Sequence, residues 1–473
     1  GDWLSNTSLE NLTSFAVCSD KTEPKLYDQI KLNKKDLNFK IDTDPKEIRK
    51  FIQKKDNSTK IIFTTYHSSE AVSKACKGIS FDIGIFDEAH RTTNFSLKHQ
   101  ETKFNMGLLN KNILIKKRVF FTATQKSYNS KLVDEYGNPK IKFNMNNPDI
   151  YGNVSYRLNF YEAQKLGAIS DYRIVISGTE SAELTEELRK RSVTYIKKNK
   201  IITDQIAHQV AIKKSIQKFN LSKIFTFHSR IPQTKSFAKK NKFNTDISHL
   251  LPNFYINYIE AKMRTTEREE IINNFKKSKK GLISNARCLI EGVDVPEVDA
   301  IAYVSPKKSK IDIVQSLGRA VRNRHNQNKK YGYILVPIFK EKFRSEKITE
   351  ATKRSNYETI SEVLDALREQ DDNLDLLLNE ANRNHKRGHG YFSKTVKKLS
   401  EKIIFLENEI NIKNLKKHIF IKVLETFRNN WDDMFGTLLR YKDKFGNCNV
   451  PFSAKGEFKE LGEWVHNLRL IRR

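Results

Sequence analysis

Two series of short apolar stretches, separated by polar stretches with helical spacing, restrict the fold of this chain more than any other feature. In the first series, the apolar stretch Ile83–Phe86 is followed at once by Asp87-Glu88-Ala89-His90. A short apolar run between polar segments is typical of a buried strand. Acidic side chains at the carboxyl end of such a strand lie where open α/β sheets bind ligands. The pattern predicts an α/β fold with a site at this edge, although a plain polar turn would also fit the four residues alone.

The other expected strands have the same short apolar character. Those of the first series are Phe15–Val17, Ile61–Thr65 and Val119–Phe121. A long polar helical stretch, from Ala182 to about Phe219, precedes the second series. Its strands are expected at Lys223–Phe227, Phe254–Tyr258, Gly281–Ser284, Ala300–Val304 and Tyr333–Val336, with a capping box at Thr266–Glu269. Strands that alternate with helices predict two parallel sheets.

The chain becomes helical and highly charged after about residue 341, and a basic loop is expected at Asn384–Gly390. Apolar residues from Val396 to Ile410 alternate at spacings of three and four, which favours a helix packed on the main body. From Trp431 onward, aromatic residues among basic ones suggest a small separate module. The predicted divisions are 1–125, 126–220 (connecting region and helices), 221–340, 341–430 and 431–473.

Lysine and arginine number 86 against 56 acidic residues, which gives a formal charge of +30 spread along the chain. Such a surplus favours a nucleic-acid partner, and a generally solvated basic surface is the alternative. No apolar run is long enough for a membrane span. The four cysteines, Cys18, Cys76, Cys288 and Cys448, form no CxxC pair, which is consistent with a reducing, cytoplasmic location.

Three further stretches carry groups suited to phosphate chemistry. Thr122-Ala123-Thr124 follows an expected strand, so its hydroxyls can bond the acidic pair. Gln315–Arg322 is expected on a helix, where Arg319 and Arg322, three residues apart, would share one face. Guanidinium groups there can stabilise charge on a transferring phosphoryl group, whereas a solvated basic face is the simpler alternative.

In the third stretch, Glu291–Pro296, Gly292 permits close approach of a ligand and Asp294 can accept from a ribose hydroxyl or from the arginines. A plain turn before the proline is the alternative.

Asp-Glu-Ala-His, Thr-Ala-Thr, Gly-Val-Asp and Gln-x-x-Gly-Arg-x-x-Arg occur here in the order found in superfamily 2 helicases. Over roughly residues 10–340 the chain resembles the DEAD/DEAH-box group related to restriction-enzyme motor subunits. This resemblance implies two RecA-like domains, with ATP and Mg²⁺ between them and nucleic acid across the top.

The resemblance also implies a role for each matching residue. Asp87 would hold the metal and, with Gly292 and Asp294, the nucleotide. Glu88 would be the catalytic base, and Arg319 and Arg322 arginine fingers, with Gln315 beside them among the catalytic residues. The residues expected to couple the two sites are His90, Thr122 and Thr124, and those expected to contact nucleic acid are Thr64, Thr65, His228, Ser229 and Arg230.

The stretch from Trp431 is similar to the helicase-associated domain found behind such motors, with Trp431 and Trp464 as its expected nucleic-acid contacts. Either tryptophan could equally form the core of a small helical module.

One departure from the family pattern concerns the phosphate-binding loop: no GxxxxGK[ST] occurs in the chain. We interpret the chain as a fragment, lacking this loop and inactive alone, of an ATP-dependent DNA helicase or translocase. The alternatives are a motor subunit of a restriction-type system, with a nuclease or methyltransferase partner, and a degenerate nucleic-acid binder that does not hydrolyse ATP. The sequence leaves DNA against RNA open.

Overall fold

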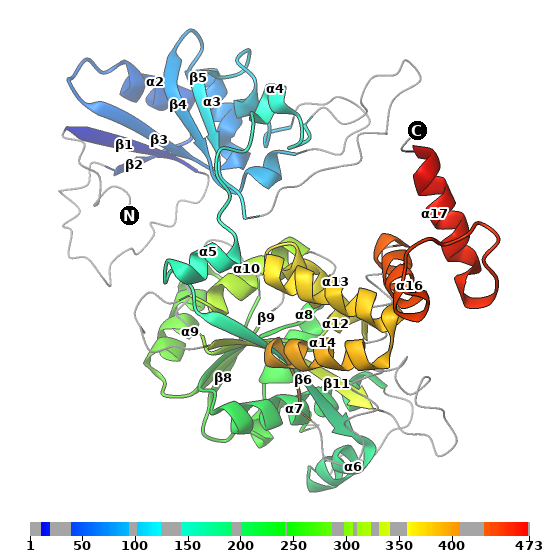
Figure 1. Ribbon diagram of the computed structural model, residues 1–473. Helices are drawn as coiled ribbons and strands as arrows, with labels where there is room; N and C mark the ends of the chain where they lie inside the picture. Colours follow the sequence, from blue (N-terminus) through cyan, green and yellow to red (C-terminus); the bar gives the residue numbers. More distant parts are fainter. Residues whose placement is uncertain are drawn as a thin grey trace. The chain divides into compact units, whose positions relative to one another are not determined.

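The computed structural model in Figure 1 describes residues 11–18, 39–93, 102–123, 143–191, 200–241, 244–260, 262–285, 298–305, 310–322, 331–340, 357–406 and 430–471. The chain divides into two compact units, Gly1–Arg157 and Leu158–Arg473. Among the residues so described, none of the helices has the length and apolar character needed to cross a bilayer.

The first unit contains two parallel ladders. Strands β1 (Leu12–Val17), β2 (Phe39–Ile41) and β3 (Thr59–Thr64) are ordered β2-β1-β3. Strands β4 (Ser80–Phe86) and β5 (Leu114–Phe120) pair with each other. The helices are α2 (Pro45–Gln53), α3 (Ser69–Ala75) and α4 (Pro148–Tyr151). Helices α2 and α3 pack on the strands around Phe15, Ile48 and Val72, which are all buried. The four strands expected in this unit are present as β1, β3, β4 and β5.

The second unit is built on a seven-stranded parallel sheet with the order β12-β6-β11-β10-β7-β9-β8. Its strands are β6 (Asp171–Glu180), β7 (Lys223–Phe227), β8 (Tyr255–Ile259), β9 (Gly281–Asn285), β10 (Ala300–Tyr303), β11 (Tyr331–Lys340) and β12 (Ile403–Leu406). Successive residues of one strand enter different cores: Ile224 packs in one, and Phe225 in the other. Because both faces are covered, the five strands from β7 to β11 are mostly apolar, which made them predictable from the sequence.

Helices cover both faces of this sheet (Figure 1). Their bounds are α5 (Phe160–Lys165), α6 (Ser181–Lys190), α7 (Lys200–Phe219), α8 (Ile231–Ala238), α9 (Thr265–Lys277), α10 (Lys310–Ala320), α12 (Tyr357–Arg368), α13 (Asp372–Arg387) and α14 (His389–Lys402). One core includes residues of α9, α10, α12, α13 and α14, and the other residues of α7 and α8. Two last helices, α16 (Asn430–Phe445) and α17 (Lys459–Ile471), enclose a small core around Val450, Phe458 and Leu461. The predicted fold class, parallel α/β domains followed by helices and a small helical module, is confirmed.

Three local predictions are wrong. The apolar run at Ile403 does not continue the helix, because α14 ends at Lys402 and residues 403–406 pair with β6 as strand β12. Strand β6 itself lies in the stretch interpreted as a connecting region. Helix α9 begins at Thr265 with Arg264 as its N-cap, so the expected capping box is not formed.

The expected basic loop before α14 is shorter than predicted, since α13 continues to Arg387 and only Gly388 separates it from α14. The predicted domain boundaries stay predictions.

Candidate functional site

The acidic turn of Asp87 and Glu88 follows β4 directly, at the carboxyl end of the strand. The Asp87 side chain is exposed, and its Oδ1 accepts the Glu88 backbone N–H at 2.9 Å. Glu88 has φ 49° and ψ 45°, a left-handed conformation that is rare for a residue other than glycine. Such a conformation costs on the order of 1 kcal/mol or more, so it persists only where neighbouring groups fix it.

Several hydrogen bonds fix this turn. The Phe121 N–H donates to the Phe86 carbonyl at 2.9 Å, and the Ala89 N–H donates to the Phe121 carbonyl at 2.8 Å. On the other side, the buried Thr92 hydroxyl donates to the Ala89 carbonyl at 2.7 Å and lies 2.8 Å from the Tyr151 hydroxyl. The end of β5 and helix α4 therefore hold the turn from two directions.

Three of the predicted coupling and catalytic residues meet at this turn. Nδ1 of His90, which is 8% exposed, lies 3.0 Å from the Thr122 hydroxyl and 3.3 Å from Oε2 of Glu88. The imidazole thus bridges the end of β5 and the acidic turn. Thr124, the other predicted coupling residue of this stretch, lies outside the described residues.

The predicted nucleic-acid contacts of the first unit adjoin the same turn. Thr64 and Thr65 are exposed at the end of β3. The next residue, Tyr66, donates from its hydroxyl to the Asp87 carbonyl at 2.6 Å. Burial, followed by the Asp87 charge, raises the pKa of Tyr66, which keeps this donor protonated. The segment after β3 is therefore bonded directly to the acidic turn, a link that the sequence did not show.

The segment after β7 holds three predicted nucleic-acid residues in different environments. His228 is buried, with Nε2 3.1 Å from the Thr226 hydroxyl and its ring against Phe237. Its burial favours a packing role. Ser229 and Arg230 are exposed at the start of α8 and can meet a ligand.

The arginine stretch differs from its expected form. Gln315 and Arg319 lie on α10 and are half-buried, but the helix ends at Ala320. Arg322 lies beyond the helix and forms a β-bridge with Ile169, so the expectation that both arginines share one helix face is wrong. Gly292 and Asp294 lie outside the described residues.

The two tryptophans of the C-terminal module lie edge to face, with ring centroids 5.0 Å apart. Trp431 is 50% exposed, whereas Trp464 is half-buried and packs on the module core. The position of Trp431 suits stacking, and that of Trp464 suits packing. Phe445 and Phe452, at 50% and 61% exposed, are further aromatic positions of the module that can meet a ligand.

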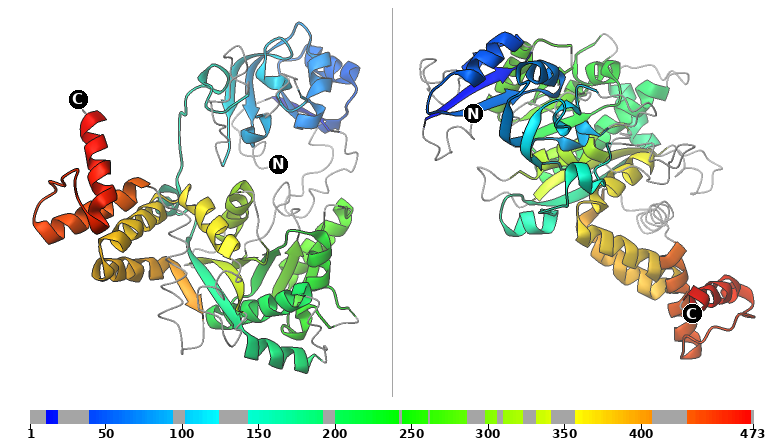
Figure 2. Two further views of the ribbon diagram at one scale, coloured as in Figure 1. Left: turned by 90° about the vertical axis from the view of Figure 1, so that its right-hand side faces the viewer. Right: turned by 90° about the horizontal axis from the view of Figure 1, so that it is seen from above.

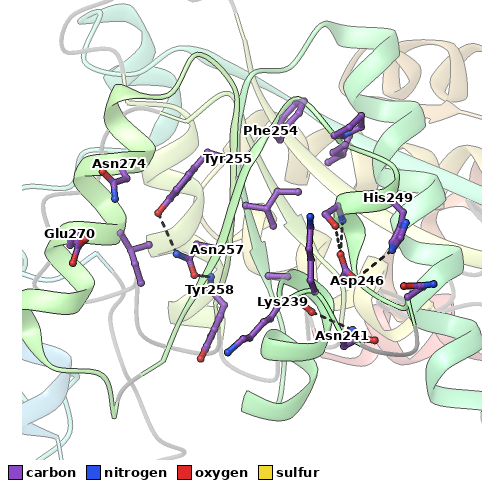
Figure 3. Close-up of a pocket in the computed structure, with 18 of the residues that line it drawn as sticks. Lys239, Asn241, Asp246, His249, Phe254, Tyr255, Asn257, Tyr258, Glu270 and Asn274 are labelled. Carbon is purple, nitrogen blue, oxygen red and sulfur yellow. Dashed lines mark hydrogen bonds and ion pairs between the residues drawn. The ribbon is translucent and has the colours of Figure 1, made fainter. Parts of the chain in front are cut away.

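A groove of about 1010 Å³ follows the outer edge of β8 and is drawn in Figure 3. Helix α9 supplies Glu270 and Asn274, and the segment after α8 supplies Lys239 and the buried Asp246. None of the predicted site residues lines this groove.

The acidic turn fits a divalent cation, since the Asp87 carboxylate is exposed and hard oxygen ligands suit Mg²⁺. No group of three or more metal-binding side chains occurs among the described residues, so any ion here would depend on water and substrate oxygens for its other ligands.

Comparison with known proteins shows which families and structures parts of the chain resemble. The helicase conserved C-terminal domain family matches residues 182–324, and the helicase associated domain family matches residues 428–473. A probable helicase of African swine fever virus is 28% identical over 342 residues, which cover 71% of this chain and 33% of the relative. A putative ATP-dependent helicase of Saccharomyces cerevisiae is 24% identical over 162 residues, or 34% of this chain and 20% of the relative.

Among solved structures, the ATP-dependent Type ISP restriction-modification enzyme LlaBIII bound to DNA aligns with a TM-score of 0.65 at 22% identity, covering 95% of this chain and 31% of the enzyme. A nuclease-deletion mutant of the Type ISP enzyme LlaGI, in complex with a DNA substrate mimic, aligns with a TM-score of 0.55 at 21% identity, covering 96% of this chain and 29% of the mutant. These likenesses show the fold.

Two parts of the chain are thus similar to helicase domain families, and the chain has the fold of the two Type ISP restriction-modification enzymes. The resemblance to helicases stated from the motifs is thereby confirmed. The chain spans about a third of the length of the viral relative and of the two restriction enzymes.

Proposed function

We propose that this chain is part of an ATP-dependent DNA helicase or translocase. The observation that carries the proposal is the fixed acidic turn after β4, in which His90 joins Glu88 to Thr122. Asp87 would hold Mg²⁺, and Glu88 would orient and deprotonate the attacking water. When bound, Mg²⁺ would supply charge neutralisation for the transferring phosphoryl group.

The chain's own residues also suggest how the turn senses nucleic acid. Tyr66 joins the segment after Thr64 and Thr65 to the Asp87 carbonyl. A strand bound at Thr64 and Thr65 would move this hydroxyl and, with it, the backbone of the acidic turn. The resemblance assigns Arg319 and Arg322 the role of arginine fingers, an effect worth roughly 10³ or more in turnover where such residues are known.

DNA is the proposed polymer, because two solved neighbours with this fold are described with DNA or a DNA mimic. The surplus of basic residues fits phosphate contact by either nucleic acid. The neighbours also motivate a restriction-type motor, with a nuclease or methyltransferase partner, as the second candidate function. A motor of this kind would work in the reducing cytoplasm, where thiols such as those of Cys76 and Cys448 are not oxidised to disulfides.

The acidic turn is tested by Glu88→Gln in a longer protein that contains this chain together with a phosphate-binding loop. ATP binding should persist while hydrolysis collapses, because only the base is removed. Glu47→Gln, a change of a half-buried glutamate on α2, is the matched control and should hydrolyse normally. Normal turnover in Glu88→Gln would refute the assignment.

Nucleic-acid binding is tested on this chain by itself. Affinity should fall with salt at a slope of about −0.7 to −0.9 per phosphate contact in log affinity against log salt. ATP hydrolysis by the chain should be negligible, because it contains no GxxxxGK[ST] segment to position the phosphates. Robust hydrolysis, or an affinity that is insensitive to salt, would contradict this proposal. Parallel titrations with DNA and RNA of one sequence decide between the two polymers.

A further inference from the structure

Helix α16, which begins the helicase-associated module, packs against the last turns of α13 (Figure 2). Three cations of α13 each face an acid of α16. The pairs are Arg383 with Asp432 at 3.2 Å, Lys386 with Asp433 at 3.9 Å and Arg387 with Asp443 at 2.7 Å. In the last pair Nε and Nη2 of the arginine bond both carboxylate oxygens, at 2.7 and 2.8 Å. Such two-point pairing fixes direction as well as distance.

A second observation, independent of charge, places the two helix backbones in direct contact. A Cβ atom built on Gly436 would lie 2.3 Å from the Arg383 carbonyl oxygen and 2.9 Å from Cβ of Lys386. No real side chain tolerates such an approach. Glycine in the middle of a helix costs about 1 kcal/mol relative to alanine, so its presence in α16 fits a need for close packing.

One exposed aromatic residue of the module, Trp431, lies beside this interface. Trp431 is 50% exposed and directly precedes Asp432 and Asp433, which face α13. On the same helix Lys442 is exposed to solvent. The acids of α16 are thus used against α13, while an aromatic ring and a cation stay available to a ligand.

We propose that α13 is a rigid mount for the helicase-associated module, so that the module and the seven-stranded sheet bind one nucleic acid as a single body. The proposal rests on the nucleic-acid binding proposed above. Helix α13 belongs to the core on one face of that sheet, through Leu374, Leu378 and Ala381, so the mount is anchored at its other end. When two binding surfaces are held together rigidly, a nucleic acid bound to the first surface meets the second at a raised effective concentration.

The test uses the whole chain and two readouts. Hydrogen exchange of the backbone amides in α13 and α16 reports docking, and fluorescence anisotropy with single-stranded DNA reports affinity. Gly436→Leu adds no charge and should accelerate exchange at the interface and weaken DNA binding roughly tenfold, as expected for lost effective concentration.

A charge swap supplies the matched control. Asp443→Arg makes the chain more positive, so simple electrostatics predicts tighter DNA binding, whereas the mount predicts weaker binding. The double variant Arg387→Asp with Asp443→Arg has the parent's net charge and should restore both affinity and protection from exchange. Tighter binding by Asp443→Arg, or no recovery in the double variant, would overturn the mount.

The two proposals fail differently. If the parent chain binds no nucleic acid at any salt concentration, the proposed function fails, and with it the role of the mount in binding. If the parent binds but Gly436→Leu changes neither exchange nor affinity, only the mount is wrong.

Discussion

The two buried histidines of the second unit should make that unit sensitive to acid. His208, on α7, is 6% exposed, and His228 is 3% exposed. Burial lowers the pKa of His208 from 6.5 to about 4. Burial, together with the proximity of His208, lowers the pKa of His228 to about 3. Both imidazoles are neutral in the folded protein at a pH where the unfolded chain binds protons.

The direction of the pH dependence of stability follows from these lowered pKa values. Stability from the two groups is fully present above pH 6.5 and is lost as the pH falls toward the folded values of about 4 and about 3. Proton linkage gives a loss of about 2 kcal/mol per histidine between about pH 7.5 and about pH 5, or about 4 kcal/mol for the pair. That amount is a large fraction of the stability of an ordinary domain.

The assay is urea unfolding monitored by hydrogen-exchange mass spectrometry of β7 and β10. Because both strands belong to the second unit, the signal reports the stability of that unit alone. The double variant His208→Gln with His228→Gln should lose most of the pH dependence, whatever its stability at neutral pH. His249→Gln, at a position with 39% of its side chain exposed, is the control. An equal loss of stability in the parent and the double variant on acidification would refute this reasoning.

Two further predictions concern packing, and a third concerns the C-terminal module. Tyr172→Phe should destabilise the second unit by about 1.5–3 kcal/mol, because the buried hydroxyl donates to Oδ2 of Asp371 at 2.6 Å; urea unfolding against Tyr161→Phe, at an exposed position, checks this. Gly332→Ala should cost about 2 kcal/mol or more, since its Cβ would lie 2.5 Å from the Ala320 carbonyl oxygen, and thermal unfolding measures it. Deleting residues 431–473 should weaken DNA affinity while the hydrogen-exchange protection of β4 and β5 stays unchanged; loss of that protection would contradict the separation of module and acidic turn.

Strands β7 to β11 of the second unit were predictable because burial on both faces leaves them mostly apolar. Strand β6 was not predicted, because polar residues such as Asp171, Arg173 and Ser177 interrupt its apolar pattern. Strand β12 was not, since a run such as Ile403–Leu406 fits a helix or a strand equally, and its pairing with β6 decides between them. The position of Arg322 depends in the same way on its bridge to Ile169, 153 residues earlier in the chain. Contacts between distant segments thus override local periodicity at both places.

The acidic turn shows the same limit at a functional position. Its residues and their place after a strand follow from sequence pattern, but the left-handed backbone of Glu88 does not, because a glutamate has no intrinsic preference for it. Two tyrosines from distant segments fix that conformation. Tyr66 lies 21 residues before its partner Asp87, and Tyr151 lies 59 residues after its partner Thr92. Gly436 was not selected from the sequence either, although a glycine within a helical pattern can indicate close packing such as its contact with α13.

The last prediction concerns the uncovered face of β4. Ile83 and Ile85 alternate along this strand and are 55% and 58% exposed, next to the acidic turn. Full burial of an isoleucine contributes roughly 1.5–3 kcal/mol, so each contributes less than half of that in this chain. Ile83→Thr with Ile85→Thr keeps β-branched side chains and should reduce binding of an apolar dye while lowering stability by about 2 kcal/mol at most. In a longer protein whose added segments cover this face, the same pair should cost about twice as much or more. Equal losses of unfolding free energy in the two proteins would show that the face stays open in both, and that the acidic turn works beside bare apolar surface.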